Sequence, residues 1–139
     1  MINIVNCEER RSEIMSWIGE KIPLEPNIVV SAAFAVERDG KFIAATCLVN
    51  CNGANVYIQA RIEPHGLNRD LIYMTFYHAF MVMGVRRISS TIIGDNIKSG
   101  KLTAHFGFQL EGVLHRIMPN GDNMYLSVLW PENCRYLEV

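Results

Sequence analysis

The sequence predicts an α+β fold of the α/β three-layer sandwich type, in which a mixed central sheet carries helices on both faces. Helix and strand patterns alternate along the whole chain, which is typical of layered α/β domains. The early strand patterns are separated by short turn signals, as antiparallel strands are. The middle of the chain reads strand, long apolar helix, strand, as a parallel βαβ unit does. At 139 residues the chain is long enough for one domain and too short for two, so residues 1–139 are expected to form a single domain.

One helix and three strands are predicted for the first half of the chain, over residues 8–22, 27–37, 41–49 and 55–62. The first range has apolar residues at helical spacing, and Pro23 ends that pattern because proline cannot continue a helix. Asp39-Gly40 is a hairpin turn signal between the first two strands. Apolar and polar residues alternate in the third strand, which ends at Glu63-Pro64.

A long helix, a buried strand, a second helix and a final hairpin are predicted for the second half, over residues 68–83, 86–93, 96–105, 108–117 and 124–130. Gly84 stands where a left-handed residue ends a helix, and either Asp95 or Asn96 is expected to cap the second helix. Asn120-Gly121 is the turn signal of the last hairpin. The predicted order therefore starts with a helix and continues β, β, β, α, β, α, β, β.

Composition argues against several classes of function. The formal net charge is -1 and basic residues are scattered, so no nucleic-acid-binding stripe is indicated. No run of about 18 apolar residues is present, so we expect no membrane association and a cytoplasmic protein. The four cysteines form no CxxC pair, so no metal site is expected and the thiols are interpreted as free.

The junction from the third strand to the long helix is the candidate anion site. Backbone N–H groups converge at a helix N-terminus, where they bind phosphate groups. Gly66 allows a close approach of the backbone, while His65 and Arg69 add positive charge. An ordinary turn is the alternative interpretation of the same residues.

Three segments of the second half resemble the GNAT family of acetyltransferases. These are residues 84–88, residues 95–99 and residues 105–114, the last containing Gly-Phe-Gln-Leu-Glu-Gly. The resemblance covers about residues 56–137 and is greatest to the ribosomal-protein N-terminal acetyltransferases. Residues 130–137 also resemble GNAT-like proteins of tailed phages. The resemblance implies the GNAT acyl-CoA N-acyltransferase fold and acetyl-CoA as the acetyl donor.

The resemblance also implies where acetyl-CoA binds. Its pantetheine arm is expected along the backbone of the third strand, and its diphosphate over the loop and the first residue of the long helix. The implied cofactor-binding residues are Gln59, Arg61, Ile62, His65, Gly66, Leu67, Asn68, Arg69, Asn96 and Ser99. Ser99 is also expected to face the leaving thiolate. Glu63, at the end of the third strand, is the candidate general base.

Three positions depart from the family pattern. Where the family's phosphate loop has Arg or Gln, Gly, and Gly or Ala, this chain has Glu63, Gly66 and Asn68, and only Gly66 agrees. Thr103 stands where many members have a tyrosine that protonates the sulfur.

Two functional hypotheses follow. The first is an N-acetyltransferase acting on an unidentified small-molecule or peptide amine. The alternative is a catalytically inactive GNAT-fold binding or assembly protein; if a phage encodes it, its expected location is the host cytoplasm. Formation of a homodimer through Tyr125, Trp130 and Tyr136 is compatible with both.

Overall fold

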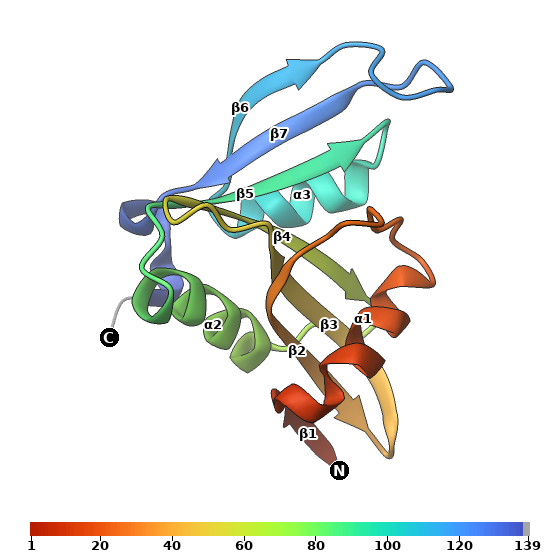
Figure 1. Cartoon of the computed structure of the whole chain (residues 1–139), viewed down its shortest axis with the longest axis vertical. Coiled ribbons are helices and arrows are strands. Elements are labelled where there is room, and N and C mark those ends of the chain that lie inside the picture. The colour runs from red at the N-terminus through yellow and green to blue at the C-terminus, as the bar shows by residue number, and fades with distance from the viewer. Residues whose placement is uncertain (138–139) are drawn as a thin grey trace.

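The computed structural model describes residues 1–137 and forms one seven-stranded mixed sheet (Figure 1). The strands are β1 (Ile2–Val5), β2 (Val30–Arg38), β3 (Lys41–Val49), β4 (Asn55–Ile62), β5 (Arg87–Ile93), β6 (Gln109–Leu114) and β7 (Met124–Leu129), in the spatial order β1-β2-β3-β4-β5-β7-β6. The α-helices are α1 (Arg11–Gly19), α2 (Arg69–Tyr77) and α3 (Ile97–His105). Short helical turns are η1 (Glu8–Arg10), η2 (His78–Val82), η3 (Pro131–Asn133) and η4 (Arg135–Leu137).

The sheet confirms the predicted mixed topology. All neighbouring strands are antiparallel except β4 and β5, which are parallel and joined through α2. Strands β3 and β4 have the predicted bounds, and Gly84 has a φ of 74°, as expected for a left-handed helix end. The predicted order was wrong at its start, because β1 precedes the first helix and pairs with β2. Strand β1 has four residues and only one of them is buried, so it gives little hydrophobic pattern.

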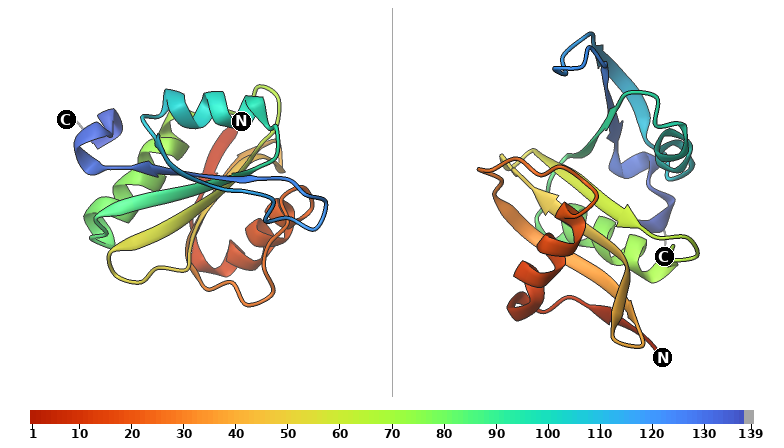
Figure 2. Two further views of the ribbon diagram at one scale, coloured as in Figure 1. Left: turned by 90° about the horizontal axis from the view of Figure 1, so that it is seen from above. Right: turned by 90° about the vertical axis from the view of Figure 1, so that its right-hand side faces the viewer.

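Helices cover both faces of the sheet, which confirms the three-layer prediction (Figure 2). On one face, Ile14 and Ile18 of α1 pack against a cluster that includes Ala33 and Cys47. On the other face, α2 packs against the alternate residues of the same strands, such as Phe34. Successive side chains of a strand point to opposite faces, so β2 and β3 contribute to both clusters.

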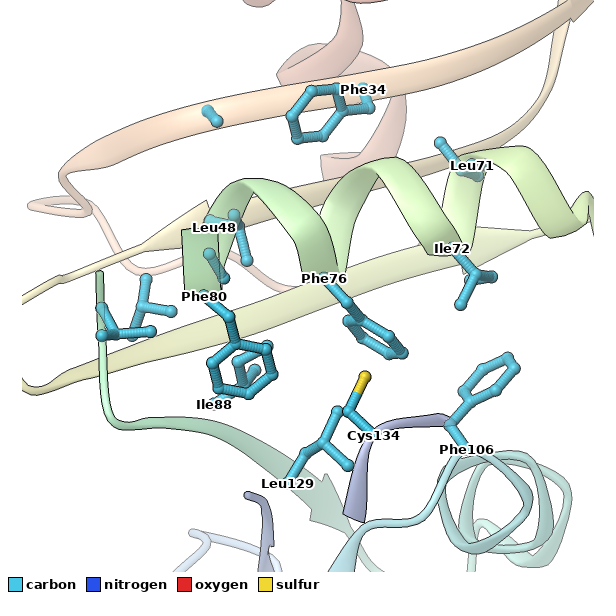
Figure 3. Close-up of a cluster of buried hydrophobic side chains, with 14 of the residues drawn as sticks. Phe34, Leu48, Leu71, Ile72, Phe76, Phe80, Ile88, Phe106, Leu129 and Cys134 are labelled. Carbon is cyan, nitrogen blue, oxygen red and sulfur yellow. The ribbon is translucent and has the colours of Figure 1, made fainter. Parts of the chain in front are cut away.

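Phe76 of α2 lies at the centre of the larger cluster and is 1% exposed. Its ring points toward Phe106 and Cys134 (Figure 3). The Tyr136 ring contacts the rings of Phe76 and Phe106, with centroid separations of 5.8 Å in both pairs. The segment after β7 is therefore folded back onto α2. Tyr136 is half-buried in these contacts.

Within residues 1–137, no helix is long and apolar enough to cross a membrane. The same part of the chain contains no group of three His, Cys, Asp or Glu side chains placed to hold a metal ion.

Candidate functional site

Strands β4 and β5 separate along their length. Their parallel pairing runs over three residues of each strand, from Asn55 opposite Arg87 to Tyr57 opposite Ser89. From Ile58 onward β4 keeps its pairing with β3 but has no partner on the β5 side. The two arrows diverge in Figure 1. The backbone of residues 58–62 therefore presents unpaired N–H and C=O groups at a V-shaped opening inside the sheet.

Helix α2 begins beside this opening. Its N-cap is Asn68, whose Oδ1 accepts a hydrogen bond from the Leu71 N–H at 3.0 Å. The first helical backbone bond runs from the Ile72 N–H to the Asn68 carbonyl. Among residues 1–137, no hydrogen bond uses the N–H groups of Arg69 and Asp70. Free N–H groups at the positive end of a helix dipole attract anions.

Gly66 has a packing role in this loop. It is buried, and its N–H donates to the Glu63 carbonyl at 2.8 Å. A Cβ atom at this position would lie 2.2 Å from the Ile43 carbonyl oxygen of β3. Only glycine fits at this position, because the loop packs directly against β3. The Gly66 N–H is already engaged in the hydrogen bond to Glu63. His65, which precedes it, is exposed and has a φ of 63°.

Arg61 and Glu63 form an ion pair at the end of β4. The Arg61 guanidinium donates to Glu63 Oε1 through Nε at 3.1 Å and also through Nη2. Its Nη1 donates to the Trp17 carbonyl at 2.7 Å and to Glu20 at 3.2 Å. Arg61 therefore links β4 to α1 and does not fill the opening between β4 and β5.

The Glu63 carboxylate is oriented by this pair and still accessible. Its side chain is 39% exposed, against 10% for the side chain of Arg61. Both hydrogen bonds from Arg61 go to Oε1. No hydrogen bond within residues 1–137 uses Oε2. Glu63 Oε2 is therefore open to a further hydrogen bond.

A cavity of about 610 Å³ lies beside the N-terminal end of α2. We call it the basic cavity, because its lining includes Arg69, His105 and Arg135 and no acidic residue. It is lined by Leu67, Arg69, Ile72, His105, Phe106, Arg135 and Tyr136. It brings together the start of α2, the end of α3 and the segment after β7. Of the predicted cofactor-binding residues, Leu67 and Arg69 lie here. His105, Arg135 and Tyr136 were not predicted as site residues, because the folding of the segment after β7 onto α2 leaves no local signal in the sequence.

Asn96 and Ser99 lie outside the basic cavity. Asn96 is the N-cap of α3, as predicted, and its Oδ1 accepts from the Ser99 N–H at 3.1 Å. Asn96 also lines a second cavity of about 350 Å³ between α3 and the sheet, with Asp95, Thr103 and Tyr125. The Ser99 carbonyl accepts a hydrogen bond from Thr103 Oγ1 at 2.6 Å. Thr103, at the position of the family tyrosine, is thus engaged with the helix backbone.

The side chains of β4 divide between the two faces of the sheet. Gln59 alternates with Ile58, so its side chain is on the α1 face with Tyr57 and Arg61, whereas Ile62 packs in the cluster under α2. Only the backbone of these residues faces the opening.

Burial shifts the pKa values of three side chains, Cys47, His78 and Cys134, and raises that of the Cys134 thiol. Burial raises the pKa of the Cys47 thiol from 9.0 to about 12, so this thiol stays protonated and is a poor nucleophile. Burial, and then the charge of Arg11, lowers the pKa of His78. The His78 ring contacts the Phe34 ring edge-on at 5.5 Å. The side chains of Cys47 and His78 thus have packing roles.

No protein-family model matches the sequence, and no curated protein matches it significantly. The structure, however, is similar to those of known acetyltransferases. Mutant N152L of the spermidine N-acetyltransferase SpeG from Vibrio cholerae superposes with a TM-score of 0.73 and 15% identity, over 99% of this chain and 96% of that one. A GNAT-family acetyltransferase from Bacillus anthracis has a TM-score of 0.61 and 18% identity, over 72% and 66% of the two chains.

RimJ from Mycobacterium smegmatis, solved in complex with CoA-disulfide, gives a TM-score of 0.60 at 22% identity. The match covers 73% of this chain but spans only about half, 53%, of the RimJ chain. At these identities the likeness establishes the fold. The protein therefore has the GNAT acyl-CoA N-acyltransferase fold that the sequence predicted.

Proposed function

We propose that the protein is an N-acetyltransferase that uses acetyl-CoA as its acetyl donor. The observation that carries this proposal is the adjoining position of three features. The sheet opens between β4 and β5, the N-terminal end of α2 follows directly on β4, and the basic cavity lies beside that end. Acetyl-CoA is a long, flexible thioester that ends in a polyanionic nucleotide, and three adjoining surfaces of this kind suit its three parts.

Each part of the donor has suitable partners. The unpaired backbone of residues 58–62 offers hydrogen bonds to the amide groups of a pantetheine arm, as a neighbouring strand would. The N–H groups of Arg69 and Asp70 and the exposed Arg69 side chain suit the diphosphate. The basic cavity suits the nucleotide, because it combines cationic side chains with apolar and aromatic walls.

The departures from the family pattern are compatible with this proposal. The Glu63 carboxylate is bonded to Arg61, which also bonds to Glu20 and to the Trp17 carbonyl, so Glu63 is held on the side of α1. Asn68 caps α2 and leaves the next two N–H groups free. The role that the resemblance gives to Gly66 falls to these N–H groups, because the Gly66 N–H is already bonded.

In the proposed reaction, the amine nitrogen of the acceptor attacks the thioester carbonyl carbon, the new N–C bond forms and the C–S bond breaks. Glu63 accepts the proton that the amine loses, at its free Oε2. The departing thiolate takes a proton, and Ser99 stays the predicted donor. The family's common tyrosine donor is replaced here by Thr103, whose hydroxyl is bonded to the Ser99 carbonyl.

The acceptor is proposed to be an amine of a small molecule or a peptide. The neighbours with this fold include a spermidine N-acetyltransferase and RimJ, and the sequence resembles the ribosomal-protein branch most. The experiment is to incubate the protein with acetyl-CoA and a panel of polyamines, aminoglycosides and peptides with free N-termini, and to measure release of the CoA thiol. We expect thiol release that depends on both the protein and one class of amine. No release above the hydrolysis background with any amine would favour the inactive binding module.

The cellular setting is part of the same proposal. We expect a cytoplasmic protein, in the host cytoplasm if a phage encodes it, and a homodimer in solution. One neighbour, the Vibrio cholerae spermidine N-acetyltransferase, has been solved as a dodecamer.

A further inference from the structure

The two cavities beside α3 differ in charge. The one between α3 and the sheet is lined by Asp95 and by no lysine, arginine or histidine. The basic cavity has Arg69, His105 and Arg135 and no carboxylate. Of these two cavities the basic cavity suits a polyanion, and Asp70 and Glu132, which adjoin its residues in the sequence or its segment after β7, are exposed and do not line it.

The cations of the basic cavity come from different walls. Arg69 is the first residue of α2, next to the free backbone N–H groups. Arg135 belongs to η4, which is held on α2 by the Tyr136 ring between Phe76 and Phe106. Two separate positive sites, one of them at a helix N-terminus, suit a ligand with two separate anionic groups.

Arg135 is fixed by the backbone and free of acidic partners. Its Nη2 donates to the His105 carbonyl at 2.5 Å and lies 3.5 Å from His105 Nε2. Among residues 1–137 it forms no ion pair. Its charge is therefore not compensated by a carboxylate, and the guanidinium has donors left for a ligand.

We infer that Arg135 is a specificity-determining residue that recognises the 3′-phosphate of the CoA nucleotide, while Arg69 and the α2 N-terminus bind the diphosphate. This inference rests on the proposed function. It assigns to the segment after β7 the discrimination between CoA and dephospho-CoA, which lacks only that phosphate. A guanidinium bound to a phosphate forms charge-assisted, often bidentate hydrogen bonds, which a neutral side chain cannot replace.

The test is a calorimetric titration of the protein with CoA and with dephospho-CoA. We expect the unmodified protein to bind CoA roughly tenfold more tightly, because one charge-assisted contact at an exposed site contributes about this factor. In R135Q the ratio of the two dissociation constants should fall to about one, because only CoA binding weakens. R135K should keep most of the preference, since it retains the charge.

R86Q is the matched control. Arg86 is exposed, its side chain makes no hydrogen bond or ion pair within residues 1–137, and it lies past the far end of α2 from the basic cavity. R86Q removes the same charge as R135Q and should leave the ratio of the two dissociation constants unchanged. Equal affinities of the unmodified protein for the two nucleotides would overturn the inference while leaving the proposed function standing. So would an R135Q variant that loses affinity for both equally, because that indicates a purely structural role. If neither nucleotide binds to the unmodified protein, both the inference and the proposed function fail.

Discussion

Replacing Gly66 with alanine is expected to destabilise the protein by about 3 kcal/mol, a large effect for one added methyl group. The new Cβ would lie 2.2 Å from the Ile43 carbonyl oxygen and 3.0 Å from the Glu63 carbonyl oxygen, and both are backbone atoms. Neither can move without shifting β3 or the loop that starts α2. Urea unfolding followed by circular dichroism measures the effect, and the melting temperature should fall by about 10 °C.

Gly100→Ala is the control for this experiment. Gly100 lies within α3, and a Cβ there would meet no atom within 4 Å. Alanine in a helix interior is favoured over glycine by up to about 1 kcal/mol, so this variant should be slightly stabilised. If Gly66→Ala were as stable as Gly100→Ala, the loop would not press on β3 and the packing role of Gly66 would be wrong.

Replacing Glu63 with glutamine is expected to lower kcat by roughly 10²-fold or more, with the affinity for acetyl-CoA unchanged. The side chain keeps its size and its link to Arg61 but can no longer accept a proton at the free oxygen, and a positioned general base contributes about this factor. Steady-state kinetics with the best acceptor amine gives kcat, and calorimetry gives the affinity.

Glu20→Gln is the matched comparison for Glu63→Gln. Glu20 accepts a hydrogen bond from the same Arg61 guanidinium at 3.2 Å, yet it belongs to the end of α1. Its replacement removes a carboxylate from Arg61 without removing the candidate base, so kcat should stay within about twofold. Equal losses in both variants would mean that the ion-pair cluster holds α1 in place and that Glu63 is not the base.

Most of the fold follows from local sequence patterns. Residues 41–49 form β3 as a continuous apolar run, whereas residues 55–62 form β4 with alternating apolar and polar residues, and turn residues bound both strands. The cap of α3 was predicted to be Asp95 or Asn96, both of which are good N-cap residues, and it is Asn96. The opening between β4 and β5 leaves no local signal, since the number of paired residues in parallel strands cannot be read from either strand alone.

The parts that the sequence did not predict depend on contacts between distant segments. Strand β1 forms because β2 offers a free edge, although its own residues are mostly exposed. Arg135 reaches His105, which lies 30 residues earlier in the chain, because η4 folds back onto α2. The hydrogen bonds from Arg61 to Trp17 and Glu20 were also not predicted, since both partners lie more than 40 residues away in the sequence.

The central claim is that acetyl-CoA binds at the N-terminal end of α2, and a calorimetric titration of the unmodified protein and of R69E tests it most directly. Glutamate at the first position of a helix is compatible with the helix dipole, so R69E should fold normally while opposing a bound diphosphate. Arg69 is exposed and lines the basic cavity, and R86E serves as the control for the charge change. We predict one acetyl-CoA bound per chain with a micromolar Kd, about tenfold or more weaker binding by R69E, and no change in R86E. No heat of binding with the unmodified protein, or equal affinities in all three proteins, would contradict the claim.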